Sequence, residues 1–309
     1  MCRNVAGTGG CRGSAAVFSQ FIVWYLFLSG TAAGAFLGAA AISLVEGNEP
    51  LLKAHVHSLN PSSFGFIVAA AGYVLSGVFL IADLGNPARI LQVVANPFQS
   101  LMSEGAWLVA LSAALAAITA ALAVVGRLNY GIALALEIVG SILSVGVLVY
   151  AGVLLSSMRT VDFWDTPLLI ALFAISGLTC GIAVISVVGF VLGGSYRREH
   201  GLGLARCASA LVEVLVLVAF LSSRYMISEA GRDSCMALFT GNLAGYFWGG
   251  VIAVGLVAPM AAAWVRRMTG QRGLVLAAAG CTLIGGYLLR YCIVECVVLS
   301  PLAFGGLFE

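Results

Sequence analysis

Long apolar runs separated by short polar breaks extend along almost the whole chain. Reading between charges and turn residues gives eight apolar segments, at about 17–45, 62–82, 105–126, 132–157, 167–194, 203–223, 244–265 and 273–298. An α-helix needs about 20 apolar residues to cross the hydrocarbon core of a bilayer. The pattern therefore predicts an all-α polytopic membrane protein with eight transmembrane helices.

The breaks between the segments have the composition of turns. They read EGNEP at 46–50, DLGNPAR at 83–89, GRLNYG at 126–131, FWDTP at 163–167, GGSYRREHG at 193–201, SEAGRDS at 228–234 and RRMTGQRG at 266–273. Gly, Pro, Asn and Asp end helices and form tight turns. We expect one transmembrane domain over 17–298, an N-terminal outer-side segment at 1–16 and a short outer-side tail at 299–309.

Composition leads to the same class of protein. Of 309 residues, 61% are hydrophobic and 9% are charged, whereas a soluble domain has about 25% charged residues. The net charge of +2 is too small to predict a nucleic-acid partner. The first apolar segment is longer than the 7–15-residue core of a signal peptide, so we expect it to stay as the first helix.

Lys and Arg in the loops predict the orientation, because loops rich in them stay on the cytoplasmic side. Eight of the fifteen lie in or beside the loops after the first, third, fifth and seventh segments, with arginine pairs at 197–198 and 266–267. Six lie in the termini and the other loops. This bias predicts both termini outside, in a bacterial cytoplasmic (inner) membrane.

A small-residue motif occurs at corresponding places in the first and fifth segments. It reads Ser29-Gly30-x-x-x-Gly34 in one and Ser176-Gly177-x-x-x-Gly181 in the other. Such motifs are typical of close helix packing in membranes. They fit equally well an internal duplication that yields two four-helix bundles, and both interpretations stay open.

No residue pattern predicts a resident metal centre. None of the eight cysteines is paired as C-x-x-C, the spacing that zinc and iron–sulfur sites normally use. The three histidines, His55, His57 and His200, fall in predicted loops, so no predicted helix offers an axial haem ligand. We expect no haem, metal or iron–sulfur cluster in this chain.

Charged residues inside or at the ends of the predicted helices need an explanation. They are Glu137, Glu213, Arg290, Glu295 and Asp83. A charge at the centre of the bilayer costs at least ~2.5 kcal/mol and usually faces the bundle interior. Two interpretations follow: buried ion pairs that fix helix packing, or a proton relay or polar pocket.

Three residues at similar depth near the outer surface are candidates for one polar site. Gln20 begins the first helix, Tyr150 lies near the outer end of the fourth, and Arg290 lies in the outer part of the eighth. Glu137, Ser141 and Ser144 share one face of the fourth helix, and an ideal helix places Tyr150 roughly opposite to Glu137. Gln20 alternatively serves only as an interfacial anchor.

Several motifs resemble one family in their order and spacing. They are WYLFLSGTAAGAF, DLGNPAR, SEGAW, ALEIVGSILSVGVLVYAGVLLSSM, TPLLIALFAISGLTCGIA, LVEVLVLVAF, YFWGGVIAVGLVAPM and LLRYCIVE. Together they cover nearly the whole chain and resemble the NrfD/polysulfide reductase membrane-subunit family. The resemblance implies a quinone- or quinol-reactive membrane subunit without metal centres of its own.

The resemblance also implies partners and site residues. The expected partner is a ferredoxin-like iron–sulfur subunit on the outer face, attached to a catalytic and often molybdopterin-containing subunit, with menaquinone as the bound substrate. Tyr150 matches a family tyrosine implicated in quinone binding, and Glu137, Glu213 and Arg290 match intramembrane charged positions. Some relatives carry His and Asn near the start of the first helix, where this protein has Phe18, Ser19 and Gln20.

This leads to an expected mechanism of two-electron, two-proton quinone chemistry. Tyr150 and Gln20 would hydrogen-bond the quinone carbonyls, and Arg290 would stabilise developing negative charge. Asp83 or Glu295 would exchange protons outward. Glu137 and Glu213 would form an inward half-channel, or serve the structure alone.

Two other functions fit the same apolar pattern. A secondary transporter or small-molecule channel is compatible with eight helices and buried carboxylates, although we expect no span to be broken by proline. A purely structural membrane anchor is the third. The sequence does not name the terminal substrate or the direction of electron flow.

Overall fold

In a computed structural model of the protein, the described residues are 19–45, 61–84, 100–125, 130–158, 161, 163–193, 196–227, 229–271 and 273–296. Over these ranges the elements are α1 (Gln20–Val45), α3 (Pro61–Leu84), α5 (Leu101–Val125), α6 (Tyr130–Ser156), α7 (Pro167–Val191), α8 (Tyr196–Ile227), α9 (Glu229–Phe239), η1 (Tyr246–Val257), α10 (Ala258–Thr269) and α11 (Leu274–Glu295). Eight spans, with η1 and α10 forming one of them, are long and apolar enough to cross a membrane. The predicted fold class is therefore confirmed. The expected terminal segments, 1–16 and 299–309, lie outside the described residues.

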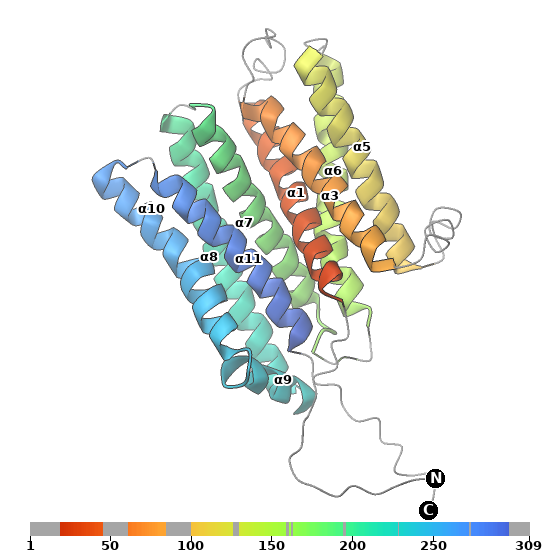
Figure 1. Cartoon of the computed structure of the whole chain (residues 1–309), viewed down its shortest axis with the longest axis vertical. Helices are drawn as coiled ribbons and strands as arrows, with labels where there is room; N and C mark the ends of the chain where they lie inside the picture. Colours follow the sequence, from red (N-terminus) through yellow and green to blue (C-terminus); the bar gives the residue numbers. More distant parts are fainter. Residues whose placement is uncertain are drawn as a thin grey trace, which may run out of the picture.

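The eight spans form two groups of four (Figure 1). The first bundle contains α1, α3, α5 and α6, and the second contains α7, α8, η1–α10 and α11. Neighbouring spans run in opposite directions, so α1, α5, α7 and η1 begin at one end of the molecule, called here the Gln20 end. The opposite end, where α1 finishes, is called the Val45 end. The short helix α9 lies at the Gln20 end.

The two bundles meet where α1 packs against α7, and the repeated Ser-Gly motifs face each other there. A Cβ atom at Gly34 would overlap the backbone of Gly177, and one at Gly181 would overlap the backbone of Gly34 and Ala35. Without these side chains the two backbones touch, which maximises van der Waals contact in lipid. The packing interpretation of the motif is thus confirmed, and the motif sits in equivalent places on the two central helices.

Two helices extend through segments that the sequence predicts as loops. α8 begins at Tyr196 and is 32 residues long, and α9 occupies Glu229–Phe239. Arg and Glu are good helix formers, so a helix keeps its backbone hydrogen bonds after its residues become polar. His200 therefore lies in a helix rather than in a loop, whereas His55 and His57 lie outside the described residues.

The seventh span changes helix type near Pro259 but is one continuous helix over Tyr246–Thr269, so it is not broken by the proline. Its first half, η1, is a π-helix of 12 residues, and α10 continues it as an α-helix with Pro259 in its first turn. The Ala258 N–H bonds to the Ala253 carbonyl, five residues earlier. Pro259 has no N–H to continue that pattern, so the change of helix type at this point has a local cause.

The connection between α6 and α7 closes the Gln20 end of the second bundle. Trp164 is fully buried there, and its indole N–H donates to the Ile293 carbonyl at 3.0 Å. Phe163 packs edge-on against Phe220, with ring centroids 5.1 Å apart. Thr166 caps α7, whose first residue is Pro167, a common helix start. The hydrogen bond from Trp164 fixes this connection to the last turn of α11.

Candidate functional site

Tyr150 lies at a junction of three helices in the first bundle. Its side chain on α6 is 9% exposed, and its ring packs directly on Gly105 of α5. Its phenol group interacts with that of Tyr25 on α1. Because α6 ends at Ser156, Tyr150 lies about 9 Å from the Gln20 end of its helix.

The Tyr25 hydroxyl is an unused hydrogen-bonding group beside Tyr150. The Tyr25 side chain is 2% exposed, and its oxygen has no partner of hydrogen-bond geometry within the structure. Buried hydroxyls nearly always find a partner, because leaving one unpaired costs about 1–3 kcal/mol. The Tyr25–Tyr150 pair can therefore donate to an acceptor that is brought to it. Sequence reasoning missed Tyr25, although it lies in the WYLFLSG motif.

Replacing Gly105 with Ala tests whether the placement of the Tyr150 ring matters. A methyl group at position 105 would overlap the ring carbon and hydroxyl of Tyr150, so the ring must move away from its position beside Tyr25. On the quinone chemistry that the sequence motifs imply, we expect quinol-linked electron transfer to fall about ten-fold, since small misplacements of reacting groups have effects of that order or larger. Steady-state quinol oxidation measures this. Gly77→Ala is the control, because nothing lies within 4 Å of a Cβ there, and equal rates in both variants would contradict the prediction.

Arg290 lies in the second bundle, completely buried where α11 meets α1 and α7. One terminal nitrogen donates to Ser176 Oγ at 3.2 Å and to the Gly286 carbonyl at 2.9 Å, and the other donates to the Phe173 carbonyl at 3.4 Å. The rings of Phe27 and Phe173 flank the guanidinium at 5.8 and 5.4 Å. These contacts and cation–π interactions stabilise a charge that would otherwise be expensive to bury.

The repeated Ser-Gly motif supplies part of the Arg290 site. Ser176 of the second copy accepts a hydrogen bond from Arg290. At Gly30 of the first copy, a Cβ atom would lie 3.0 Å from the Arg290 guanidinium. The same small residues therefore let α1 and α7 touch and leave space for a buried cation.

Glu213 interacts with the same serine from the other side. Its carboxyl on α8 is buried and interacts with the hydroxyls of Ser176 and Thr179 and, electrostatically, with Arg290. A cavity of about 10 Å³ adjoins Glu213, with Cys180 of α7, Thr282 of α11 and Gly255 of η1 in its wall. That volume is close to the minimum that one water molecule needs. Ser176 thus lies between the Arg290 guanidinium and the Glu213 carboxyl group, beside a water-sized space.

Glu137 belongs to a separate series of buried polar groups along α6. It is fully buried, and its carboxyl interacts with the Ser43 hydroxyl of α1 toward the Val45 end. Seven residues further on, Ser144 Oγ lies 3.0 Å from the Tyr73 hydroxyl of α3. Glu137, Ser144 and Tyr150 thus follow one another at intervals of about 10 Å along the helix.

The other three predicted residues lie at the Gln20 end. Gln20 is exposed as the first residue of α1. Asp83, near the end of α3, accepts a hydrogen bond from Ser19. Glu295 is the half-buried last residue of α11. These positions suit exchange of protons with water at the surface rather than contact with Tyr150.

The structure does not bring Gln20, Tyr150 and Arg290 together as one site. Tyr150 meets α1 at Tyr25, whereas Arg290 meets it at Phe27 and is held by α7 and α11. Similar depth was the only basis for grouping them. Depth does not indicate which face of an all-apolar helix points to which neighbour.

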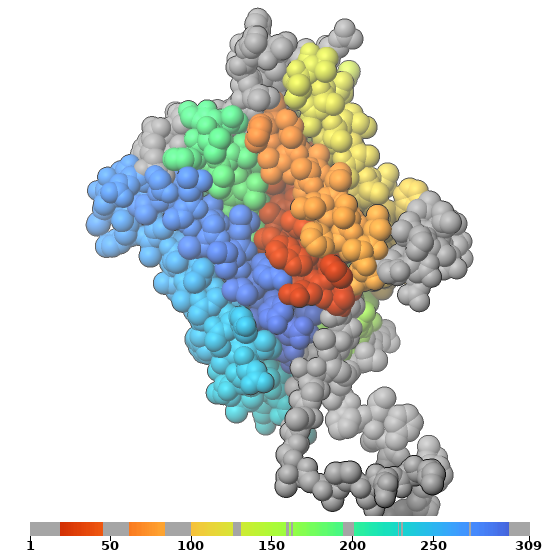
Figure 2. Space-filling view, viewed as in Figure 1, coloured from red at the N-terminus to blue at the C-terminus, as the bar shows by residue number. Residues whose placement is uncertain are grey.

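An aromatic cluster leads from the surface toward Arg290. Trp24 lies 4.4 Å from Tyr287 and 5.9 Å from Phe79 between ring centroids, and Tyr287 packs edge-on against Phe27 at 5.8 Å. Figure 2 shows α1 reaching the surface as a narrow strip between α3 and α11, the helices that carry these partners. Flat rings pack favourably on such clusters. Sequence reasoning did not identify this cluster, because its members come from three helices.

Clusters of side chains that could hold a metal ion are absent from the part of the protein that the structure describes. No cluster of three or more His, Cys, Asp or Glu side chains among those residues is arranged to hold a metal ion. The six cysteines described there are all free thiols.

The fold and the buried groups define a class: a polytopic membrane protein with a phenol pair in one bundle and a buried Arg–Ser–Glu cluster in the other. Comparison with known proteins identifies the family. The family model described as "Polysulphide reductase, NrfD" matches residues 12–301, so the chain belongs to the NrfD family, as its motifs predict.

Two relatives illustrate this membership. The C subunit of polysulfide reductase from Wolinella succinogenes is 28% identical over 272 residues, which cover 77% of the present sequence and 82% of that protein. Protein NrfD of Escherichia coli is 30% identical over 161 residues, or 50% of each sequence.

Proposed function

We propose that this protein is the quinone-reactive membrane subunit of a multi-subunit oxidoreductase. Membership of the NrfD family supports this role, and one relative is by name a single subunit of a polysulfide reductase. This protein binds the quinone or quinol in the membrane, and its partner subunits carry the redox centres. The terminal substrate is then chosen by a catalytic subunit.

The Tyr25–Tyr150 pair is the observation that carries the proposal. A quinone presents two carbonyl oxygens, and a phenol O–H is a suitable donor to each. The Tyr25 hydroxyl is buried without a partner next to Tyr150, and Gly105 provides the space in which the Tyr150 ring lies. The pair therefore orients a quinone or quinol at the Gln20 end.

Protons and electrons leave this site by different routes. Oxidation of one quinol releases two electrons and two protons, and reduction of one quinone consumes them. The electrons pass to or from a ferredoxin-like iron–sulfur subunit docked at the Gln20 end. The protons exchange at Tyr150 with carboxylates near the surface, of which exposed Glu104 interacts electrostatically with Tyr150. Asp83 and Glu295 are two further carboxylates at the Gln20 end that take part in this proton exchange.

The buried charges have a second role in this proposal. Glu213, Ser176 and Arg290 form a polar cluster beside a water-sized cavity, which suits the holding and passing of a proton within the second bundle. Glu137 and Ser144 provide a comparable series in the first bundle. Arg290 acts here through the cluster rather than on the same quinone carbonyl as Tyr150, since its hydrogen bonds go to Ser176 and to the Gly286 and Phe173 carbonyls.

Reduction of the partner's clusters by a menaquinol analogue tests the proposal. The intact complex in proteoliposomes should show cluster reduction on addition of menaquinol, followed by electron paramagnetic resonance, and its rate should respond to an imposed membrane potential if protons cross the membrane. A complex assembled without this subunit is the control and should show no reduction. Equal reduction in that control, or insensitivity of the complex to quinone analogues, would leave the protein as a structural anchor.

The irregular seventh span is the observation that favours a transport role instead. Helices of irregular geometry near buried polar groups are found at the binding sites of secondary transporters, and Gly255 of the π-helical η1 lies in the wall of the cavity beside Glu213. Under this alternative, the purified protein would never associate with an iron–sulfur protein and would mediate solute or ion flux in liposomes by itself.

A further inference from the structure

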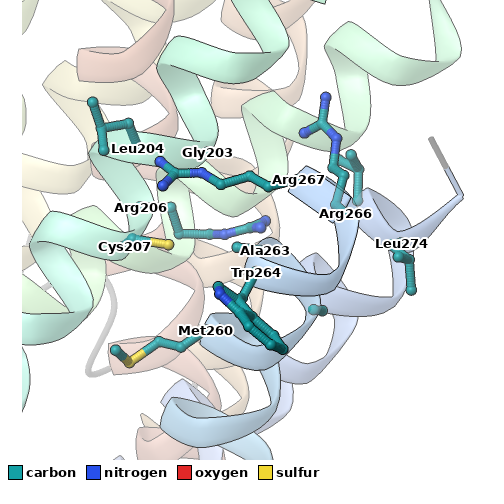
Figure 3. Close-up of a pocket in the computed structure, with 12 residues that line it drawn as sticks. Gly203, Leu204, Arg206, Cys207, Met260, Ala263, Trp264, Arg266, Arg267 and Leu274 are labelled. Atoms are coloured by element: carbon teal, nitrogen blue, oxygen red, sulfur yellow. The ribbon is translucent and has the colours of Figure 1, made fainter. Parts of the chain in front are cut away.

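A cavity of about 340 Å³ lies at the Val45 end of the second bundle, away from the Tyr25–Tyr150 pair. Figure 3 shows the residues that line it. Its wall is formed by α8, α10 and α11, and the cavity has no part in the proposed quinone chemistry. Among its lining residues are three arginines, Arg206, Arg266 and Arg267. None of the lining residues within the described part of the chain is acidic.

Arg206 is the buried cation of this cavity. Its side chain is 3% exposed, and two of its three guanidinium nitrogens, Nε and Nη1, are buried with no hydrogen-bond partner in the structure. Figure 3 shows the side chain reaching from α8 toward α10, across the cavity. Charged groups are almost never buried unpaired, because the loss of hydration is not compensated. The two unpaired nitrogens of Arg206 therefore need a hydrogen-bond acceptor from outside the described part of the protein.

The other arginines around Arg206 indicate that the hydrogen-bond acceptor in this cavity is an anion. Arg266 acts on Arg206 as a like charge, so it adds to the positive charge around the two unpaired nitrogens of Arg206. Planar guanidinium groups bind phosphate oxygens with paired N–H donors. A neutral quinone ring would leave the buried charge of Arg206 uncompensated, which argues against a second quinone site.

The rest of the cavity is apolar and lies near the surface of the bilayer. Leu204, Met260 and Leu274 contribute to its wall, and Trp264 beside them is 61% exposed. Arg206 lies five residues into the apolar span that begins at Gly201, or about 7–8 Å from its start. This is the depth at which a lipid phosphate and its glycerol group meet the acyl chains.

We propose that this cavity binds the phosphate of an anionic phospholipid headgroup. Arg206 donates to the phosphate from the floor of the cavity, and Arg266 and Arg267 neutralise its charge at the rim. The apolar wall and exposed Trp264 contact the glycerol and the first part of the acyl chains. Basic pockets between transmembrane helices on the cytoplasmic side bind such headgroups, and the distribution of Lys and Arg predicts that the Val45 end is cytoplasmic.

Lipid titration of the full-length protein, purified in detergent with any bound partners and then delipidated, tests this proposal. The melting temperature is followed while cardiolipin, phosphatidylglycerol, phosphatidylcholine or inorganic phosphate is added. We expect cardiolipin and phosphatidylglycerol to raise it with saturation, and phosphatidylcholine to have little effect. Equal stabilisation by phosphatidylcholine would overturn the anion requirement, and equal stabilisation by inorganic phosphate would assign the site to free phosphate instead of lipid.

Matched arginine variants locate the effect. Arg206→Gln should raise the half-saturating concentration of cardiolipin about ten-fold, and exposed Arg267→Gln about five-fold. Arg232→Gln, an exposed arginine in α9 at the other end, should leave it unchanged. If Arg206→Gln does not fold, Arg267→Gln decides: an unchanged half-saturating concentration in that variant would overturn the proposal.

Discussion

Tyr150→Phe is expected to lower quinol-linked electron transfer about a hundred-fold while the membrane complex stays assembled. The ring keeps its packing on Gly105, so the variant loses only the hydroxyl group. Removing a positioned acid–base group commonly lowers rates by about 10²–10⁴-fold, whereas losing one hydrogen bond changes stability by only about 1 kcal/mol. The variant should therefore lose turnover but keep a normal amount of assembled complex.

Two measurements on membranes carrying the variant show this separation. The rate of quinol oxidation is followed spectrophotometrically, and the amount of complex is quantified by native gel electrophoresis. Tyr225→Phe is the matched control, because Tyr225 is exposed at the end of α8 at the same end of the molecule. Wild-type turnover in Tyr150→Phe would remove Tyr150 from the site, and loss of both turnover and complex would make its role structural.

The positions of the spans could be predicted because they follow from local chemistry. Each helix that crosses the bilayer needs about 20 apolar residues, and the breaks rich in Gly, Pro and Asn can be recognised directly in the sequence. The helix ends were less predictable where polar residues continue a helix, as at Arg197 and Arg198 in α8. The π-helix before Pro259 was not predicted, although a proline inside an apolar span indicates that the helix there can be irregular.

The composition of the site was predicted better than its arrangement. Tyr150, Glu213 and Arg290 were identified as buried polar residues, because charge or hydroxyl groups in an apolar run need a reason. Their partners were not, because Tyr25 and Ser176 lie on other helices. Hydrophobic periodicity normally indicates which face of a helix is buried, but helices that are apolar all round carry no such signal.

The Ser-Gly motif shows how one sequence feature serves both packing and chemistry. Gly177 and Gly181 permit contact between α1 and α7, and this contact brings Phe27 of α1 over the Arg290 guanidinium. Ser176, one residue before the first of these glycines, connects Arg290 to Glu213. The helix interface and the polar cluster therefore depend on the same few residues.

The cluster predicts that Arg290→Gln and Glu213→Gln are not additive. Arg290→Gln alone should lower the free energy of unfolding by about 2–3 kcal/mol, because it removes hydrogen bonds from a charged donor and leaves the buried Glu213 carboxyl group without its neighbouring cation. Adding Glu213→Gln removes that uncompensated group. The double variant should therefore be less destabilised than the sum of the single variants, by about 1–3 kcal/mol.

A double-mutant cycle measured by SDS-induced unfolding in mixed micelles tests this coupling. Arg232→Gln combined with Glu213→Gln provides the control cycle, since Arg232 is exposed in α9 and stacks on Tyr225 with 5.1 Å between the guanidinium carbon and the ring centroid. That cycle should be additive within about 0.5 kcal/mol. Additivity in the Arg290 cycle as well would show that the two buried charges stabilise the bundle independently, and Ser176 would then not connect them energetically.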